Sequence, residues 1–509
     1  MYNLSLIVER NADRRPEKEV IVFGERRMTN RDLRRRVNAL AAGLREQGVR
    51  RGNVVALLMY NCPEFLESVF AINKLGAVFL PLNYRLAPPE WEYILDHSGA
   101  VGIITESEFA GQIEGVAGAL PALKTRILVD GAQPGWTAYD RLQGAQAGEL
   151  VPDAEMVEDD LQRLMYTSGT TSRPKGVRIT HGNLIWKNIG HIVEFGINAE
   201  DKTLIAGPLY HVGGFDLPAN VVLYAGGSVV LLRKFDAIEV LETTQRERPT
   251  NMWLAPAMVN MVLQVPNLES YDLSSVRFII NGGEKMPVPL IQRILRAFPN
   301  AWFSDAYGLT ETVSGDTFVD RDHVISKIGS VGKPVIHLAL RLVNEAGEDV
   351  PTGEIGEVVL RGPKVFKGYW RDEAATGAAI RNGWFHTGDV GRIDEDGYLY
   401  IVDRMKDMIV SGGENVASPE VERALYEHPA VLEAAVIGVA DERWGEVPKA
   451  FVVVREGQTV TADALIDHCR ARLARFKVPT YVEFIAALPR NPSGKVLKRE
   501  LRKAESASR

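Results

Sequence analysis

Apolar runs alternate with helix-like segments early in the chain, and this alternation limits the fold more than any other feature of the sequence. The runs at 54–59 and 78–82 have the length and the continuous apolar character of buried strands, and the segment 63–76 between them has a helical period. A third run, 101–105, follows another helix-like segment, 88–99. Buried strands joined by crossover helices form parallel sheets. The sequence therefore predicts a parallel α/β layer.

A second group of apolar runs predicts a second layer of the same kind. It comprises the predicted strands 228–232, 278–280 and 302–304 and the helix-like segment 288–297. From 329 to 369 the helical period is lost, and short strands indicate a small antiparallel β-barrel. The first 403 residues are therefore predicted to form a large N-terminal domain of two α/β subdomains plus a small β-barrel.

The pattern resets after Arg404. Predicted helices at 419–426 and 462–473 alternate with predicted strands at 432–439 and 450–454. This segment has the size of an ordinary domain of about a hundred residues. We predict that 408–509 forms a small α+β C-terminal domain, so that the whole chain is of the α/β class. The residues after Lys503 form a polar tail.

Composition sets limits without choosing a function. A chain of 509 residues, 46% of them hydrophobic, is too long for one compact core. The net charge of −7 argues against a nucleic-acid partner, because no basic excess can displace counterions from phosphates. Cys62 and Cys469 have no metal-ligand spacing, which fits a reducing, cytoplasmic setting. No run approaches the roughly 20 apolar residues that span a bilayer, so we expect no stable membrane insertion.

The segment 166–177, YTSGTTSRPKGV, directly follows an apolar run and has the chemistry of a phosphate-binding loop. Small residues let backbone N–H groups approach an anion, hydroxyls add donors and a lysine adds positive charge. The loop lacks the Gly-x4-Gly-Lys-Ser/Thr order of the Walker type. It nevertheless predicts an ATP-using enzyme, whose candidate phosphate contacts are Thr167, Ser168, Gly169, Thr170, Thr171 and Lys175.

This loop and five later segments together resemble the adenylate-forming superfamily of acyl- and aryl-CoA synthetases, luciferases and peptide-synthetase adenylation domains. The later segments are AYGLTET at 306–312, WFHTGDV at 384–390, VDRMKD at 402–407, SGGENV at 411–416 and PRNPSGKVL at 489–497. The resemblance implies that ATP adenylates a carboxylic acid with release of pyrophosphate, and that the acyl group then passes to coenzyme A. One departure is Ser172 with Arg173, where the family usually has a glycine and a variable residue.

The resemblance also implies roles for single residues in adenylation. Lys495 is the expected catalytic cation near the α-phosphate, and Glu311 with Thr167 is the expected Mg²⁺ site, since Mg²⁺ prefers hard oxygen donors. Tyr307 has a flat face suited to adenine, and Asp389 can accept two hydrogen bonds from the ribose diol. The remaining expected nucleotide contacts are Gly283, Glu284, Asp305, Ala306, Gly308, Thr310 and Arg404.

The second step is expected to involve a moving C-terminal domain. The resemblance implies a hinge at 404–407, centred on Lys406, and a rotation that exchanges Lys495 for the 411–416 turn. Gly412 and Gly413 are expected to leave room for the pantetheine of coenzyme A, and Glu414 is expected to contact the same cofactor. Weaker candidates for contact with the coenzyme A nucleotide, which could equally be solvated or core residues, are Trp444, Lys449, Arg475 and Lys477.

The acid is the least determined part of the site. His211 matches a family histidine at the entrance to the acyl pocket, and the other expected pocket residues are Gly213, Gly214, Phe215, Trp253, Asn281 and Gly282. The motifs favour a medium- or long-chain fatty acid, with an aromatic acid of the coumarate, ferulate or benzoate type as the alternative. An adenylating enzyme with an acceptor other than coenzyme A is a more distant alternative. The sequence leaves a homodimer open.

Overall fold

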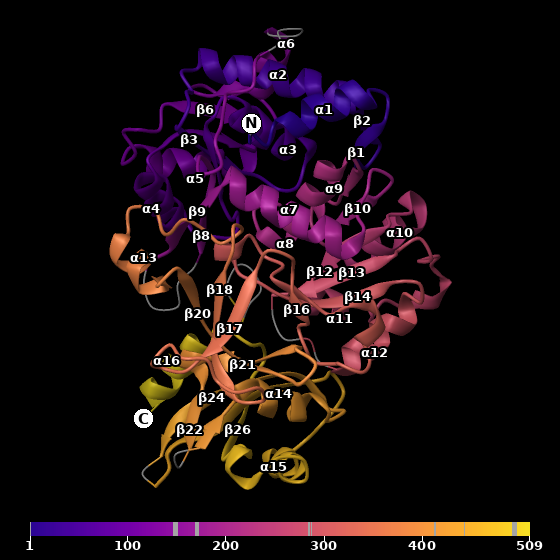
Figure 1. Ribbon diagram of the computed structural model, residues 1–509, viewed down its shortest axis with the longest axis vertical. Coiled ribbons are helices and arrows are strands. Elements are labelled where there is room, and N and C mark those ends of the chain that lie inside the picture. The colour runs from indigo at the N-terminus through magenta and orange to yellow at the C-terminus, as the bar shows by residue number, and fades with distance from the viewer. Residues whose placement is uncertain are drawn as a thin grey trace.

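The computed structural model describes residues 2–145, 151–167, 173–283, 286, 288–411, 414–441, 443–490 and 496–508. Within these ranges the strands form four sheets. Figure 1 shows two large α/β layers in the upper part of the molecule, an antiparallel sheet below them, and the C-terminal elements at the lower end. The order of layers along the chain is therefore the one that the sequence predicts.

The first layer is a seven-stranded sheet of order β7-β6-β5-β3-β4-β8-β9, and its pairings are parallel except for β8 with β9. The apolar runs near residues 54, 78 and 101 form its centre, and the helix-like segments between them form α3 and α4. Its elements are α2 (Asn30–Glu46), β3 (Val54–Leu58), α3 (Pro63–Lys74), β4 (Val78–Pro81), α4 (Pro88–Ser98), β5 (Ala100–Thr105), α5 (Ser107–Ala117), β6 (Thr125–Leu128), β7 (Thr137–Ala138), α6 (Tyr139–Ala145), β8 (Leu161–Thr167) and β9 (Lys175–Thr180).

The second layer is a nine-stranded sheet of order β16-β15-β14-β13-β12-β10-β11-β1-β2. Its predicted helix, 288–297, has the predicted bounds. Its elements are α1 (Leu6–Arg14), β1 (Glu19–Phe23), β2 (Arg26–Thr29), α7 (His181–Phe195), β10 (Lys202–Ile205), β11 (Ser228–Leu231), α10 (Ala237–Glu247), β12 (Asn251–Leu254), α11 (Pro256–Val262), η2 (Leu268–Ser270), β13 (Phe278–Gly282), α12 (Val288–Ala297), β14 (Trp302–Tyr307), η3 (Thr310–Thr312), β15 (Thr317–Phe318), η4 (Arg321–His323) and β16 (Lys333–Pro334). The sequence did not predict that β1, from the N-terminal segment, pairs in parallel with β11.

The predicted barrel region is a five-stranded antiparallel sheet that continues as far as Arg404. Its strands pair in the order β17-β18-β20-β19, and β21 also pairs with β20. The elements are β17 (Ala339–Val343), β18 (Ile355–Arg361), α13 (Glu373–Ala379), β19 (Ile380–Arg381), β20 (Trp384–Ile393) and β21 (Leu399–Arg404). Asp389 is on β20 and Arg404 on β21 of this sheet, and Asp389 contacts Tyr307 of the second layer.

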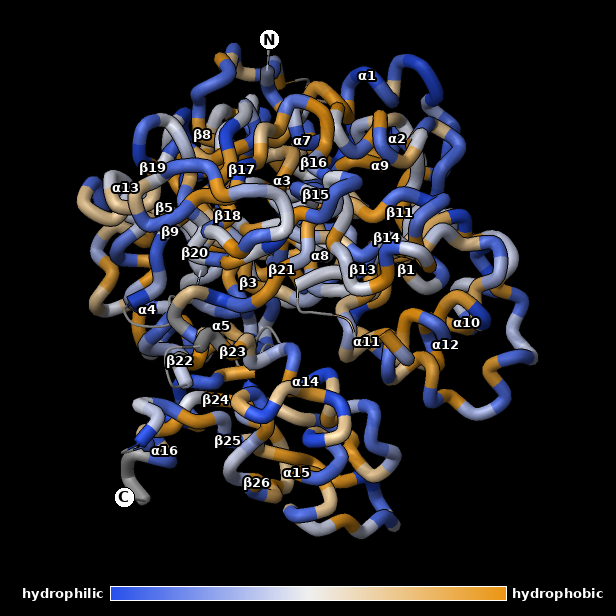
Figure 2. Tube along the Cα trace, turned by 60° about the horizontal axis from the view of Figure 1, so that its bottom comes forward, coloured by the Kyte–Doolittle hydropathy of each residue, from blue (hydrophilic) through white to orange (hydrophobic). Residues whose placement is uncertain are grey.

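The C-terminal elements surround cores of their own. Val421, Leu425, Val436 and Leu465 are fully buried together, and Figure 2 shows apolar residues inside this lower lobe. The elements are η5 (Met405–Asp407), β22 (Ile409–Ser411), β23 (Glu414–Val416), α14 (Ser418–Tyr426), β24 (Val431–Asp441), β25 (Gly445–Val454), α15 (Ala462–Arg470), η6 (Arg475–Lys477), β26 (Tyr481–Phe484) and α16 (Lys498–Ser508). A separate core supports the predicted boundary near residue 404, which stays a prediction.

The polar tail, the two cysteines and the expected lack of a membrane span can each be compared with the structure. Residues 504–508 of the polar tail are the last part of α16, and Leu501 of this helix is buried at 5% exposure in a core with residues of β24 and β25. Cys62 and Cys469 are both buried and free. Among the described residues, no helix has the length and apolar character needed to cross a bilayer.

Candidate active site

The predicted phosphate loop is the connection of a β-hairpin. Thr167 ends β8, Lys175 begins β9, and the two residues are opposite each other in the antiparallel pair. Ser168, Gly169, Thr170, Thr171 and Ser172 lie outside the described residues. Arg173, the second departure from the family pattern, places its guanidinium 5.1 Å from the centre of the Tyr93 ring. The pairing of β8 with β9 thus fixes the positions of both ends of the loop, at one side of the first sheet.

Glu311, the expected Mg²⁺ ligand, is held by a residue that the sequence did not predict. The Tyr369 hydroxyl donates to Glu311 Oε1 at 2.9 Å, and Lys175 Nζ lies 4.9 Å from the centre of the Tyr369 ring. Burial raises the pKa of the Glu311 carboxyl, while its hydrogen bond with Tyr369 opposes that rise. Tyr369 therefore connects the lysine of the phosphate loop with the expected metal ligand.

Asp389 lies between the expected adenine and hinge residues. The Tyr307 hydroxyl donates to Asp389 Oδ2 at 2.8 Å, and Arg404 Nε lies 3.3 Å from Asp389 Oδ1. Asp389 and Arg404 are also directly opposite in the pairing of β20 with β21. Because the charges of Arg404 and Asp389 both influence the Glu311 carboxyl, these groups share one electrostatic environment. A Cβ at Gly308 would collide with the backbone of Gly315, so only glycine allows this approach of chains.

The expected acid-binding residues lie at the carboxyl ends of neighbouring parallel strands. Trp253 is near the end of β12, Gly282 ends β13 and Tyr307 ends β14, and these strands are adjacent in the sheet. Trp253 is opposite Ile280, which is opposite Ser304, so Tyr307 lies two strands away from Trp253 and three residues further along the sheet. Ligands of α/β sheets bind at this carboxyl edge. Asp305 and Ala306 are opposite Asn281 and Gly282 in the same register.

His211 is oriented by its own backbone. It precedes α8 (Val212–Gly214), and its Nδ1 accepts a hydrogen bond from the Gly213 N–H at 3.1 Å. In the neutral ring the proton is therefore on Nε2, which makes that nitrogen the donor. The His211 ring centre lies 6.4 Å from that of Trp253. The indole and the imidazole are therefore neighbours, and together they form what we call one wall of the predicted acyl pocket.

Phe215 has the contacts of a core residue. It begins the π-helix η1 (Phe215–Asn220), and its ring packs on Phe79 and Phe65 at centre distances of 5.8 and 6.5 Å. A place for Phe215 in the acid pocket stays a prediction that these contacts do not favour. Asn281 is fully buried, and its Nδ2 donates to the Leu254 carbonyl at 2.7 Å.

A buried charge cluster behind the acid segment was not predicted from the sequence. Arg163 on β8 and Asp216 on η1 form an ion pair of 2.5 Å whose side chains are both 0% exposed. Lys187 on α7 donates to the backbone carbonyl of Asp216, and burial lowers the pKa of Lys187 to about 7. The strand that leads to the phosphate loop is therefore tied to the segment that follows His211.

Several further expected site residues lie outside the described part of the structure. These are Glu284 of the N-terminal region together with Gly412, Gly413 and Lys495, and nothing is described of the side chains of Lys406 and Glu414. Trp444 is 48% exposed at the end of the β24–β25 hairpin. Lys449 pairs with Glu483 and Glu505, and Lys477 pairs with Glu420, so these two cations already have partners.

The junction of the two regions contains a further carboxylate. Asp403 Oδ2 accepts hydrogen bonds from the Ser418 N–H at 2.9 Å and from the Ser418 hydroxyl at 2.7 Å. Ser418 is the first residue of α14, so Asp403 of β21 caps that helix from outside. Lys498 Nζ also donates to the Ser418 hydroxyl, at 2.5 Å.

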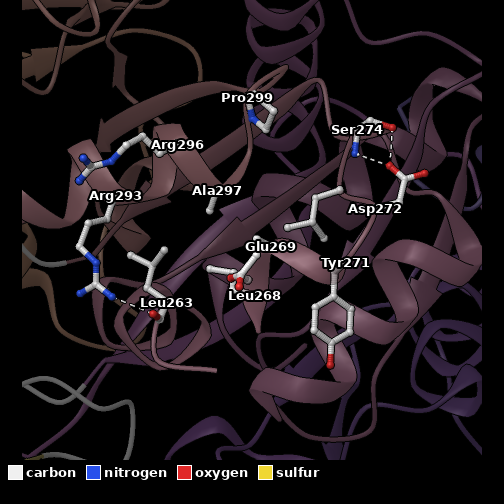
Figure 3. Close-up of a pocket in the computed structure, with 11 residues that line it drawn as sticks. Leu263, Leu268, Glu269, Tyr271, Asp272, Ser274, Arg293, Arg296, Ala297 and Pro299 are labelled. Carbon is white, nitrogen blue, oxygen red and sulfur yellow. Dashed lines mark hydrogen bonds between the residues drawn. The ribbon is translucent and has the colours of Figure 1, made fainter. Parts of the chain in front are cut away.

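A hollow of about 560 Å³ lies elsewhere in the second layer, between η2 and α12. Figure 3 shows Arg293, Arg296, Leu263 and Tyr271 around it, with Arg293 donating to the Leu263 carbonyl. None of the predicted site residues lines this hollow. It is therefore separate from the site described above.

Comparisons with known proteins agree with this architecture. The model of the family "AMP-binding enzyme" matches residues 8–370, and that of the AMP-binding enzyme C-terminal domain matches residues 420–495. The chain belongs to the AMP-binding enzyme family. Within that family it is an AMP-forming acid–thiol ligase, whose substrates are a carboxylic acid, ATP and coenzyme A, with Mg²⁺ as the metal ion.

Three known proteins are similar to this chain in sequence or in structure. A feruloyl-CoA synthase from Amycolatopsis sp. is 42% identical over 97% of both chains. The crystal structure of an anthranilate CoA ligase in complex with anthranoyl-AMP has a TM-score of 0.93 and 32% identity, covering 100% of this chain and 98% of the other. An o-succinylbenzoate CoA synthetase from Bacillus subtilis in complex with ATP and magnesium ion has a TM-score of 0.85 and 33% identity, over 97% and 99%.

Proposed function

We propose that this enzyme is a ligase that joins an aromatic carboxylic acid to coenzyme A. The observation that carries the proposal is the similarity over nearly the whole chain to a feruloyl-CoA synthase, together with the anthranilate and o-succinylbenzoate enzymes among the similar structures. These similarities support the aromatic acid, the alternative substrate in the sequence analysis, better than the medium- or long-chain fatty acid that the motifs favour. A homodimer and a cytoplasmic location stay predictions.

In the first step, a carboxylate oxygen attacks the α-phosphorus of ATP, the bond to the β-phosphate oxygen breaks, and pyrophosphate leaves. Negative charge accumulates on the phosphoryl oxygens, so the site must supply cations and donors. We assign Lys495 and Lys175 as the cations, and residues 167–171 as donors to the phosphates. Asp389 and Tyr307 would hold the ribose and the adenine.

The residues around Glu311 fit a magnesium ion. A half-buried carboxylate with a raised pKa benefits from a nearby cation, which replaces the solvation that the site removes. The Tyr369 hydroxyl fixes one carboxylate oxygen and leaves the other for the metal. Mg²⁺ at this position would neutralise phosphate charge. The contribution of this chain is to orient Glu311 through Tyr369.

In the second step, the thiolate of coenzyme A attacks the acyl carbonyl carbon, and AMP leaves with the electron pair of the acyl–oxygen bond. The 411–416 turn must then replace Lys495 beside the adenylate, and we propose that the region after Lys406 rotates as one body. Arg404 would remain with Asp389, since both precede the hinge. Asp407 and Arg502, which pair at 2.8 Å, both follow Lys406 and would move together.

The test is an assay of the purified enzyme with ATP, Mg²⁺, coenzyme A and a panel of cinnamic, benzoic, indole-containing and fatty acids. Thioesters are identified by mass spectrometry, and pyrophosphate is measured in parallel. The proposal expects thioesters of one or more aromatic acids with equimolar pyrophosphate. Thioesters of fatty acids alone would overturn it. A Glu311→Gln variant is the matched control, because it keeps the shape of the side chain and removes the charge needed for Mg²⁺.

A further inference from the structure

The Trp253 indole N–H is a buried hydrogen-bond donor with no partner among the described residues. The residue is only 7% exposed, so water does not readily satisfy the group. Leaving a buried donor unpaired costs its desolvation free energy, and such groups are rare in folded proteins. The indole N–H groups of Trp91, Trp136, Trp186 and Trp302 have acceptors at 2.8–2.9 Å. The Trp370 indole N–H also lacks a partner among the described residues, but Trp370 as a residue is only half-buried, whereas Trp253 is buried. An unpaired donor at this place therefore points to a missing acceptor.

The backbone around Trp253 is shaped for its ring. A Cβ built on Gly213 would lie 2.5 Å from Cζ2 and 2.8 Å from Cε2 of the indole, and a Cβ on Gly207 would lie 2.6 Å from Cζ3. No real Cβ tolerates such distances, so the two glycines leave the space that the six-membered ring fills. Because Cε2 is the carbon bonded to Nε1, the N–H is at the Gly213 side of the ring. That side leads to His211, whose Nδ1 accepts from Gly213.

The position of this donor fits the acid rather than the nucleotide. Trp253 is on β12, two strands away from β14, which ends with the expected adenine contact Tyr307. The ring belongs to the wall that includes His211, the expected entrance of the acyl pocket. A saturated acyl chain has no atom that could accept the hydrogen bond. A hydroxyl, methoxy or carbonyl oxygen on an aromatic ring has one.

We propose that Trp253 determines specificity by donating its indole N–H to an oxygen substituent of the aromatic acid. The inference rests on the proposed function and narrows it to aromatic acids that carry such an oxygen. A site built to pair with a substrate oxygen discriminates against the analogue that lacks it, because the buried donor is then left unpaired.

The experiment compares wild type with Trp253→Phe on matched pairs of cinnamic and benzoic acids, with and without hydroxyl or methoxy groups. The wild type should prefer the oxygenated member of at least one pair. Trp253→Phe should lose roughly five- to tenfold in kcat/KM for that member, the usual effect of one neutral hydrogen bond, and change the unsubstituted acid by less than about twofold. The oxygenated acid should also raise the Tm of wild type more than that of the variant.

Two controls separate the donor from the packing of the ring. Trp136→Phe removes a buried indole N–H that donates to Glu114 away from the site, and it should leave the preference unchanged. If Trp253→Phe fails to fold, benzothienylalanine at position 253 keeps the ring size and replaces only the N–H with sulfur. An equal loss for all aromatic acids, or no loss for any, would overturn the inference alone. Absence of aromatic thioesters with wild type would instead overturn the proposed function.

Discussion

Replacing Asp216 by asparagine should destabilise the protein far more than the loss of an exposed ion pair. The Arg163–Asp216 pair has both side chains fully buried, and the Arg163 guanidinium lies over the rings of Phe79 and Phe215, 5.7 and 5.4 Å from their centres. Asp216→Asn keeps the shape but leaves the buried Arg163 guanidinium without the charge of its partner. Breaking a buried pair in this way costs about 3–5 kcal/mol.

The chain offers a control of matched geometry. Arg248 and Asp272 pair at 2.6 Å, nearly the same distance, but their side chains are 54% and 49% exposed. Asp272→Asn should cost about 0–1 kcal/mol, since solvent screens that pair. Both variants are unfolded in urea and followed by fluorescence and circular dichroism, with the m-value checked for each transition. A cost for Asp216→Asn no larger than that for Asp272→Asn would refute the reasoning.

The pH dependence gives a second readout on the same cluster. Burial lowers the pKa of Lys187 from 10.5 to about 7, the Asp216 charge opposes this, and Arg163 and Lys364 add to it. Between these two pKa values the unfolded chain binds the proton that the folded protein lacks. Lys187 therefore makes the unfolding free energy rise with pH in that window, by at most about 1.4 kcal/mol per unit. Asp216→Asn lowers the pKa of Lys187 further, so the rise should begin at lower pH.

Three further changes test the catalytic assignments. Tyr369→Phe removes a hydrogen bond that lowers the pKa of Glu311, so the acid limb of the pH profile of pyrophosphate release should move to higher pH and the Mg²⁺ requirement should increase; an unchanged profile would contradict the role of Tyr369. Arg404→Gln should raise the KM for ATP several-fold and leave the fold intact by circular dichroism, whereas an unaltered KM would remove Arg404 from the nucleotide site. Ser172→Gly should change the ATP KM or turnover by several-fold at most, and steady-state kinetics with complete loss of activity would show that this reasoning is wrong.

The local periodicity of apolar residues predicted most of the helices and strands of the two large layers. The helices α3 and α12 and the strands β3, β4 and β13 follow from apolar spacing, because their neighbours in the sequence also cover them in the fold. The pairing of β1 with β11 could not be predicted, since about two hundred residues separate partners such as Ile21 and Val229 and the pattern of β1 fits several sheets. The helix α16 was missed because its sequence is mostly polar.

The candidate site was predictable where one segment carries several groups. Thr167, Glu311 and Asp389 were proposed from motifs, whereas Tyr369 was not, because it lies 58 residues from Glu311 and no local spacing links them. The same holds for Arg163 and Asp216, which are 53 residues apart. The kind of acid was beyond the sequence for a related reason, since it depends on which side chains from separate strands face one cavity.

Asp403 and Ser418 stand on opposite sides of Lys406 along the chain, and their two hydrogen bonds belong to one orientation of the C-terminal region. The proposed rotation would break both, and hydrogen bonds to a charged group are worth about 1.5–3 kcal/mol each. These two hydrogen bonds would shift the equilibrium constant between the two orientations of the C-terminal region by orders of magnitude, unless the other orientation has contacts of equal free energy. The Asp403 carboxylate that caps α14 would then influence the lifetime of the acyl-adenylate, because the C-terminal region must change orientation before the thiol of coenzyme A can attack.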